Sequence, residues 1–391
     1  MYFNLRFKKI IFMLSIFMKK FILYFILRYY LAVNYFKKFY FKKLLHNYFK
    51  KLKAAKFKNN FDKILIDGYW ENPNYWLRLN LIFKGLNISN VKKVGLIGKY
   101  SRRSVKQSFS IFQIHDLIDS KKIIVNENDI SNKANNLLAH LKTNKDFFNH
   151  KLPYDFPPEL FYDSLLKELA TPTVNINDAR LPKLLFDLFK DIEIAFKIFS
   201  DSKFSLFLCS HSIGATYGSL IWAAIKNNVK VICLYGNFGT SRFIKYEKLS
   251  QLTHHICPTP SKQQFFNLDK KHELAFFKMG ENYFKERINS LTNDIGAKLA
   301  IHKKNKVITK KEILNYFNLK NKKIITVFTH HWSDFPHSLG LKNFIDFKEW
   351  FDITLEEAAK NKKFIWMFKG HPISEKYNYS STKLLKKFIT K

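Results

Sequence analysis

Two short stretches bring together side chains that can exchange protons and hold anions. The first, 329–337, has the sequence T-H-H-W-S-D-F-P-H and so contains three histidines and an aspartate. The second, 369–372, has the sequence K-G-H-P and adds a lysine and a fourth histidine. Each follows an apolar run, 324–328 or 364–368, of the kind that forms a buried strand of a parallel sheet. Imidazole and ammonium groups in such loops could bind phosphate and act in acid–base catalysis.

The segment between these two loops is predicted to form a helix. Its apolar side chains recur at spacings of three and four and therefore share one face: Phe344, Phe347, Phe351, Leu355 and Ala358. We expect Asn343 to cap this helix and Asp346 to lie in its first turn, where a carboxylate complements the helix dipole. The result is a βαβ unit whose two loops leave the carboxyl ends of its strands. Open α/β sheets bind ligands at that edge.

A second βαβ unit is predicted over 204–235. Phe204–Cys209 and Val229–Tyr235 are apolar runs typical of buried strands, and the segment between them has helical spacing. His211 follows the first of these strands, in the same kind of position as the histidines above. We expect Ser212 to cap the helix, whose first N–H groups would favour an anion. The alternative for His211 is simple capping or packing at the end of the strand.

These motifs together resemble those of bacterial glycosyltransferases that build surface carbohydrate and capsular polysaccharide. The matching patterns are H-W-x-D-x-P-H from His331, F-x-D-F-x-x-W from Phe344, W-x-x-K-x-H-P from Trp366, S-H-x-x-x-x-x-Y-G from Ser210, G-Y-W-x-N-P from Gly68 and G-x-x-Y-x-x-x-R from Gly280. One departure is Gly370, where the family more often has proline. The resemblance covers roughly residues 65–380 and implies the two-domain GT-B fold.

The resemblance implies transfer of a sugar from a nucleotide-sugar donor to a glycan or lipid-linked acceptor. Such a transfer needs a base for the acceptor hydroxyl and cations for the leaving phosphate. We assign the base to His211, with Asp67 as the alternative, and expect His330 to be a surface residue. The donor-binding residues would be Lys369, His371, His331, Asp334 and His337. No cofactor is expected besides the donor substrate, and no metal, because the loop lacks helical H-x-x-x-H spacing.

The expected fold is α/β and GT-B-like, with two Rossmann-like domains, the second incomplete, after a basic helical segment. We divide the chain into a membrane-surface segment (1–60), an N-terminal acceptor domain (61–255), a helical connector (256–320) and a partial donor domain (321–391). Only nineteen residues follow Pro372. A full GT-B donor domain needs more, so the resemblance leads us to expect a C-terminally truncated chain of doubtful activity.

Further elements follow from apolar runs and helical spacing along the rest of the chain. Strands are predicted at 91–98 and 123–125, and helices at 74–86, 159–169 and 182–199. Cys209, Cys233 and Cys257 show no metal-ligand spacing, so we expect reduced thiols.

The charge is strongly positive, with a formal net value of +36 over 391 residues. Residues 1–60 contain fifteen Lys or Arg and no Asp or Glu. Their apolar runs are interrupted by Lys19, Lys20 and Arg28, so an interfacial helix on an anionic membrane fits better than a spanning helix. We therefore expect a cytoplasmic protein attached peripherally to the inner face of the cell membrane. A true span, a solvated basic tail and a misassigned start codon are the alternatives.

Two other classes of function remain open. One is a non-catalytic, membrane-associated component of polysaccharide assembly or export. The other is a nucleic-acid-binding protein, which the charge alone supports and for which the sequence has no binding motif. Binding of a nucleotide-sugar would separate the glycosyltransferase from both.

Overall fold

The computed structural model describes ten parts of the chain: 62–70, 79–80, 91–100, 103–235, 242–253, 263, 266–289, 291, 309–319 and 323–371. All structural statements below concern these residues. The predicted membrane-surface segment 1–60, most of the helix predicted at 74–86, Cys257 and the chain after His371 lie outside them.

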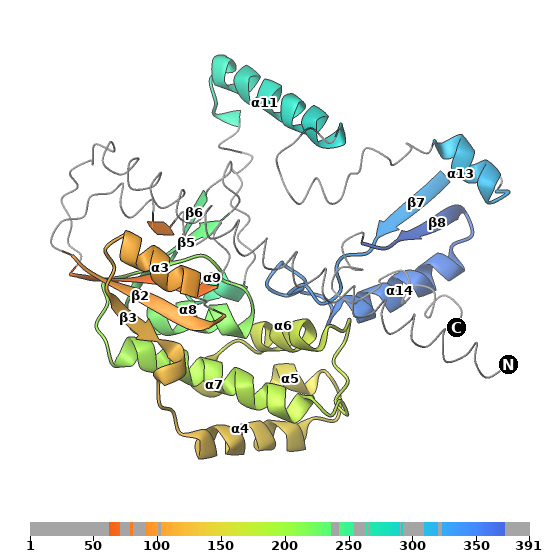
Figure 1. Cartoon of the computed structure of the whole chain (residues 1–391). Helices are drawn as coiled ribbons and strands as arrows, with labels where there is room; N and C mark the ends of the chain where they lie inside the picture. Colours follow the sequence, from red (N-terminus) through yellow and green to blue (C-terminus); the bar gives the residue numbers. More distant parts are fainter. Residues whose placement is uncertain are drawn as a thin grey trace, which may run out of the picture.

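A six-stranded sheet forms the centre of the first structural unit (Figure 1). Its strand order is β3-β2-β1-β4-β5-β6. The strands are β1 (Lys63–Trp70), β2 (Lys92–Tyr100), β3 (Asp116–Asp119), β4 (Leu206–Cys209), β5 (Lys230–Tyr235) and β6 (Arg242–Tyr246). The first five are parallel, and β6 is antiparallel to β5. The expected α/β class is thus confirmed, and this strand order is compatible with a Rossmann-like fold.

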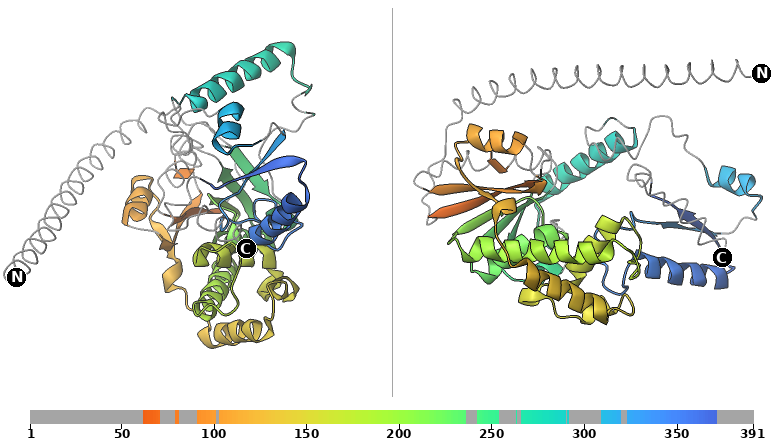
Figure 2. Two further views of the ribbon diagram at one scale, coloured as in Figure 1. Left: turned by 90° about the vertical axis from the view of Figure 1, so that its right-hand side faces the viewer. Right: turned by 60° about the horizontal axis from the view of Figure 1, so that its bottom comes forward.

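Helices cover both faces of this sheet (Figures 1 and 2). The helix α3 (Arg103–Ile111) lies on one face. The other carries α6 (Pro158–Leu169), α7 (Leu181–Ser200) and α8 (Gly214–Lys226), with α4 (Glu127–His140) and α5 (Asp146–Asn149) beyond them. Because side chains alternate along a strand, Ile64 and Ile66 join the core on the α3 side, whereas Leu65 joins the core on the other side.

Most of the predicted elements of this unit are confirmed, and one is wrong. The predicted strands at 91–98, 204–209 and 229–235 correspond to β2, β4 and β5, and the predicted helices at 159–169 and 182–199 correspond to α6 and α7. Residues 123–125 are not a strand: they follow a short 3-10 turn (Ser120–Lys122), and Ile124 is 84% exposed. The strand is instead β3, whose sequence D-L-I-D has a charged residue at each end and only two apolar residues between them.

The second unit consists of β7 (Lys323–Phe328), α14 (Phe347–Lys360) and β8 (Phe364–Lys369). Its two strands are parallel, as the βαβ prediction requires. Trp332 and Phe351 are completely buried in its small core. The predicted cap is wrong, however. Asp346, not Asn343, is the N-cap, and its carboxylate accepts from the backbone N–H groups of Lys348 and Glu349, at 3.0 Å each.

The elements described within the predicted helical connector, 256–320, are the helices α11 (Lys270–Ile288) and α13 (Lys310–Tyr316). The edge strand β6, which was not predicted, and the short α9 (Ser250–Thr253) precede this region. The helix α11 stands apart from both units (Figure 1), and none of its residues is buried. Within the described parts of the chain, no helix is long and apolar enough to cross a membrane.

Candidate active site

The strand order locates the candidate site. From the middle of the sheet, β1, β2 and β3 follow one another towards one edge, and β4 and β5 follow one another towards the other edge. The order therefore reverses between β1 and β4, and α/β proteins bind ligands at the carboxyl ends of the strands beside such a reversal. Asp67 lies near the carboxyl end of β1, and Ser210 and His211 directly follow β4.

Asp67, Ser210 and His211 form a hydrogen-bonded group, here called the β4 cluster. The Ser210 hydroxyl donates to Asp67 Oδ2 at 2.6 Å and lies 2.9 Å from His211 Nδ1. Because the single hydroxyl proton goes to the carboxylate, Ser210 must accept from Nδ1–H. The proton of the neutral ring is thereby placed on Nδ1, and its basic lone pair on Nε2.

The His211 ring is held in a largely apolar setting. It lies 4.9 Å, centroid to centroid, from the ring of Tyr217, which in turn contacts Tyr69. Burial lowers the pKa of His211 to about 3, because the imidazolium is poorly solvated there. The ring is therefore neutral at physiological pH, as a general base must be.

Asp67 is better suited to orienting Ser210 than to serving as the base. It is only 3% exposed. Its carboxylate accepts from the Tyr69 N–H at 2.7 Å and from the Ser210 N–H at 3.0 Å, besides the hydroxyl. Burial raises the pKa of Asp67, and these hydrogen bonds oppose the rise. Because these bonds engage the carboxylate, we favour His211 over Asp67 as the base, and this assignment stays a prediction.

The start of α8 differs from the expected anion site. Ser212 does not cap it; Ile213 is the N-cap residue and makes no capping bond through its side chain. The first N–H groups donate to hydroxyls from elsewhere: Gly214 N to Ser338 Oγ at 3.3 Å, and Ala215 N to Ser164 Oγ at 2.6 Å. Because these two N–H groups are already bonded to hydroxyls of the protein, they are not available to a phosphate, which argues against the expected anion site there.

A loop of the second unit, 329–346, lies against this region and is here called the docking loop. The ring of Phe335 packs on Gly214, where an added Cβ would come within 2.5 Å of it. Gly214 also has a φ of +62°, so glycine is required there on two grounds. The docking loop therefore touches the chain three residues after His211.

Asp163 of α6 is the main anchor of the docking loop. This completely buried carboxylate accepts four hydrogen bonds: from His337 N at 3.1 Å, His337 Nδ1 at 2.8 Å, Ser338 N at 2.7 Å and Ser338 Oγ at 2.8 Å. His337, 6% exposed, thus holds the two units together. This placement does not fit the donor-binding role expected for it.

Two further contacts join α6 to the second unit. Lys167 Nζ lies 2.8 Å from Asp334 Oδ1. The Tyr162 hydroxyl donates to Asp346 Oδ2 at 2.8 Å. Asp334, also expected to bind the donor, is therefore paired with a lysine of the first unit.

The remaining donor-site candidates gather at the carboxyl ends of β7 and β8. The ring of His371 lies 6.1 Å from that of His330 and 6.3 Å from that of His331, centroid to centroid; we call these three the histidine cluster. Burial lowers the pKa of both His331 and His371, and the neighbouring imidazoles lower it further. Lys369 Nζ lies over the ring of Phe328, at 5.6 Å. His330 is exposed, as expected, and its ring stacks on that of Phe347.

The site contains residues to which the motifs assigned no role. Ser210 begins one of the motifs but was given no function, and Asp163 and Lys167 belong to none of them. The only signal for Asp163 was a charge inside the apolar helical run L-F-Y-D-S-L-L. The structure brings Asp67 and His211 together, and it brings His331 and His371 together. The resemblance to GT-B enzymes further implies that His371 faces His211 across a cleft between the two units, and this stays a prediction.

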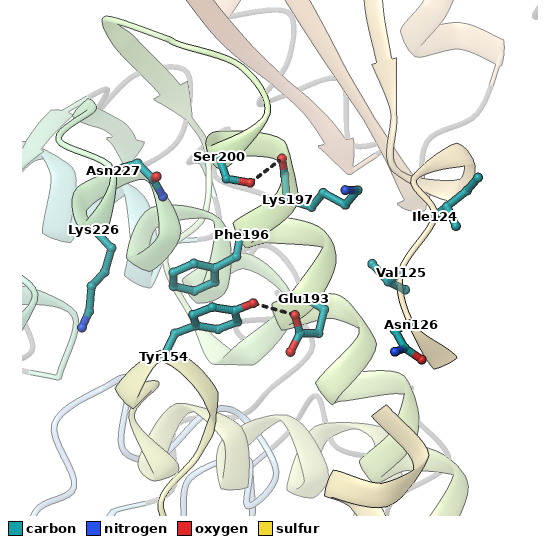
Figure 3. A pocket seen from close by; sticks show the side chains of 10 residues that line it. All are labelled: Ile124, Val125, Asn126, Tyr154, Glu193, Phe196, Lys197, Ser200, Lys226 and Asn227. Atoms are coloured by element: carbon teal, nitrogen blue, oxygen red, sulfur yellow. Dashed lines mark hydrogen bonds between the residues drawn. The ribbon is translucent and has the colours of Figure 1, made fainter. Parts of the chain in front are cut away.

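One pocket lies far from these groups. It has a volume of about 540 Å³ and is walled by the ends of α7 and α8 and by residues 124–126 and 154 (Figure 3). Lys226 and Asn227, at the end of α8, line it, whereas His211 precedes the start of the same helix.

Among the described residues, no group of three or more His, Cys, Asp or Glu side chains is placed to hold a metal ion. Comparison with protein-family models, curated proteins and solved structures gives no match.

Proposed function

We propose that the chain is a glycosyltransferase of surface polysaccharide synthesis with a GT-B-like arrangement. It would transfer a sugar from a nucleotide-sugar to a glycan or lipid-linked acceptor. The observation that carries the proposal is the β4 cluster at the reversal of the strand order. It supplies a neutral histidine whose lone pair is fixed on Nε2, which is the requirement for a base that accepts a hydroxyl proton.

In the proposed reaction, His211 Nε2 takes the proton of the acceptor hydroxyl as that oxygen attacks the sugar. Ser210 and Asp67 keep the ring oriented, and the Asp67 carboxylate favours the imidazolium that forms. A pKa of about 3 makes His211 a weak base by itself. The phosphates of a bound donor would raise this pKa, because a nearby anion stabilises the imidazolium.

The leaving nucleotide would be held by the second unit. Lys369 and the histidine cluster lie at the carboxyl ends of two parallel strands, where phosphates bind in α/β proteins. Lys369 supplies a fixed positive charge. His331 and His371, with their lowered pKa values, would take up protons as the phosphate charge arrives.

Titration with a panel of nucleoside diphosphates, followed by turnover assays with the matching nucleotide-sugars, tests the proposal. We expect saturable nucleotide binding, weakened in His371→Ala. His211→Gln should bind the nucleotide normally and lower turnover by about 10²–10⁴-fold, the usual contribution of a general base. The matched control is His272→Gln, an exposed histidine of α11 bonded to Asp269.

Two outcomes would contradict parts of this proposal. If no nucleotide binds, the chain does not use an activated sugar, and a non-catalytic role in polysaccharide assembly takes its place. If nucleotide binds and His211→Gln retains full turnover, the reaction class stands and the base lies elsewhere.

We further propose that the protein attaches peripherally to the inner face of the cell membrane through residues 1–60. The support is their composition: fifteen basic side chains, no acidic ones, and interspersed aromatic residues. Each Lys or Arg near an anionic surface contributes about 1 kcal/mol. The protein should therefore sediment with phosphatidylserine vesicles at low salt and be released by high salt. Equal binding to neutral phosphatidylcholine vesicles would contradict this mode of attachment.

A further inference from the structure

The pocket at the far end of α8 is a separate site from the β4 cluster. Helix α8 has 13 residues, so its two ends are about 20 Å apart at 1.5 Å per residue. The volume of about 540 Å³ falls within the roughly 300–1,000 Å³ of small-molecule sites. Nothing in the proposed transfer chemistry uses it.

The turn that carries Tyr154 into this pocket is strained. Tyr154 and Asp155 have φ values of +58° and +53°, so two successive residues other than glycine adopt the left-handed conformation. Each such residue costs on the order of 1 kcal/mol, and strain of this kind concentrates at functional positions. The strain in this turn therefore points to a functional role for the pocket.

Contacts from α8 hold this turn in place. The indole N–H of Trp222 donates to the Tyr154 carbonyl at 3.0 Å, and Lys226 Nζ lies 3.2 Å from Asp155 Oδ2. The ring of Phe156 packs edge-on against Trp222, at 5.9 Å. Both sides of the left-handed pair are thus anchored to one helix, which fixes the direction in which Tyr154 points.

The anchored turn presents a flat aromatic surface. The ring of Tyr154 lies on the ring of Phe196, 3.7 Å between centroids and 8° from parallel (Figure 3). One face of Tyr154 is covered by this stack, yet 43% of the residue is exposed. Its hydroxyl donates to Glu193 at 2.7 Å, and Glu193 is in turn held by Lys133 at 2.7 Å. The aromatic surface and the carboxylate beside it are both fixed before any ligand arrives.

Polar groups surround this surface. Asn126, Asn227 and Ser200 contribute amides and a hydroxyl, and Glu193 contributes a carboxylate. Side-chain amides and carboxylates match the hydroxyls of a sugar, and the apolar C–H face of a pyranose fits against an aromatic ring. A nucleotide base would be better held between two aromatic rings, whereas the other apolar residues that line the pocket, Ile124 and Val125, are aliphatic.

We propose that this pocket binds one pyranose ring of a glycan chain, with the ring stacked on Tyr154. The inference goes beyond the transfer reaction and does not require it, since a chain that only handles polysaccharide could use the same pocket. A second glycan contact remote from the reaction centre would hold a long acceptor chain while its end is at the β4 cluster.

Saturation-transfer NMR of the full chain tests the proposal with a panel of methyl pyranosides of glucose, galactose, N-acetylglucosamine and glucuronic acid. At least one should bind with a Kd of about 1–10 mM, as expected for a single-ring contact. Tyr154→Asn removes the ring while retaining a residue that tolerates the left-handed conformation, so the fold should survive. It should weaken binding at least about tenfold, since stacking and its supporting contacts are lost.

Two control variants accompany this measurement. Tyr316→Asn removes an exposed tyrosine of α13 and should leave binding unchanged. His211→Gln should also leave it unchanged, which separates this site from the proposed reaction. Absence of saturable binding by every pyranoside, equal binding by the wild type and Tyr154→Asn, or preferential binding of uridine at Tyr154 would each overturn the proposal.

Discussion

The same three residue types occur twice in this molecule, with opposite results. In the β4 cluster, Ser210 precedes His211, and the serine hydroxyl stands between the histidine and Asp67. In the docking loop, His337 precedes Ser338, and both bond directly to Asp163. The first arrangement leaves a partly exposed imidazole at the end of a strand. The second buries its imidazole between two structural units.

The difference shows that a buried carboxylate near a histidine does not by itself indicate catalysis. Asp67 receives all its bonds from strands and turns of one unit, so its role is to set the orientation of a neighbour. Asp163 receives all four of its bonds from the other unit, so its role is attachment. The connectivity of the hydrogen bonds, more than the residue types, separates the proposed reaction centre from the joint.

The largest effect on stability is expected from Asp163→Asn. This change removes the charge and replaces one acceptor with an amide donor that faces N–H and O–H donors. Hydrogen bonds to charged groups contribute about 1.5–3 kcal/mol each, so a loss of about 3–5 kcal/mol in unfolding free energy is expected. Urea denaturation measures it. Asp187→Asn, which breaks an exposed pair with Lys183 on α7, is the control and should cost less than about 1 kcal/mol. A similar small cost for both would mean that Asp163 is not the anchor.

The two serines provide the sharpest contrast between the regions. Ser210→Ala should lower turnover about 10–100-fold, the usual effect of losing a group that orients a functional histidine. Its KM should hardly change, because the serine acts through the ring of His211. Ser338→Ala should leave turnover nearly unchanged and lower the unfolding free energy by about 1–2 kcal/mol. Equal effects of the two changes on turnover would remove the distinction drawn here.

A smaller effect should appear in the pH dependence of stability. The folded pKa of His211 is about 3, whereas an unperturbed histidine has a value of 6.5. Between these values the unfolded chain binds a proton that the folded chain does not, so stability rises with pH and is lost as pH falls from 6.5 towards 3. The contribution is up to about 1.4 kcal/mol per pH unit. His211→Gln should flatten this slope, which urea denaturation of the wild type and the variant over this pH range would measure. The raised pKa of Asp67 acts in the opposite sense and is present in both proteins.

Much of this architecture could be predicted because the signals are local. The runs that became β4, β5, β7 and β8 are short and apolar, and the helices α6 and α7 have clear 3.6-residue spacing. Errors arose where side-chain exposure did not follow residue type. Ile124 is apolar but exposed in a loop, and the edge strand β3 has only two apolar residues, between two aspartates.

The candidate site was predictable only in part, for a different reason. Motifs identified His211 and His371 because a strand end can be located from sequence. The partnership of Asp163 with His337 joins residues 174 positions apart, and nothing local encodes it. The choice between Asn343 and Asp346 as helix cap likewise depended on a tertiary contact, since Asp346 also accepts a bond from Tyr162.

The smallest expected effect isolates that contact between the units. Asp346 both caps its own helix and accepts the Tyr162 hydroxyl, so it combines the local role of Asp67 with the joining role of Asp163. Tyr162→Phe removes this joining bond and the longer bond that the same hydroxyl accepts from the Val174 N–H at 3.3 Å, while the ring and its packing remain. We expect a loss of about 1 kcal/mol, the typical net value of the shorter bond. Thermal and urea unfolding should both show it, and Tyr316→Phe, whose ring is largely exposed, should show none. If Tyr162→Phe costs as much as Asp163→Asn, the joint is distributed along α6. If it costs nothing, the attachment of the docking loop depends on Asp163 and its neighbours alone.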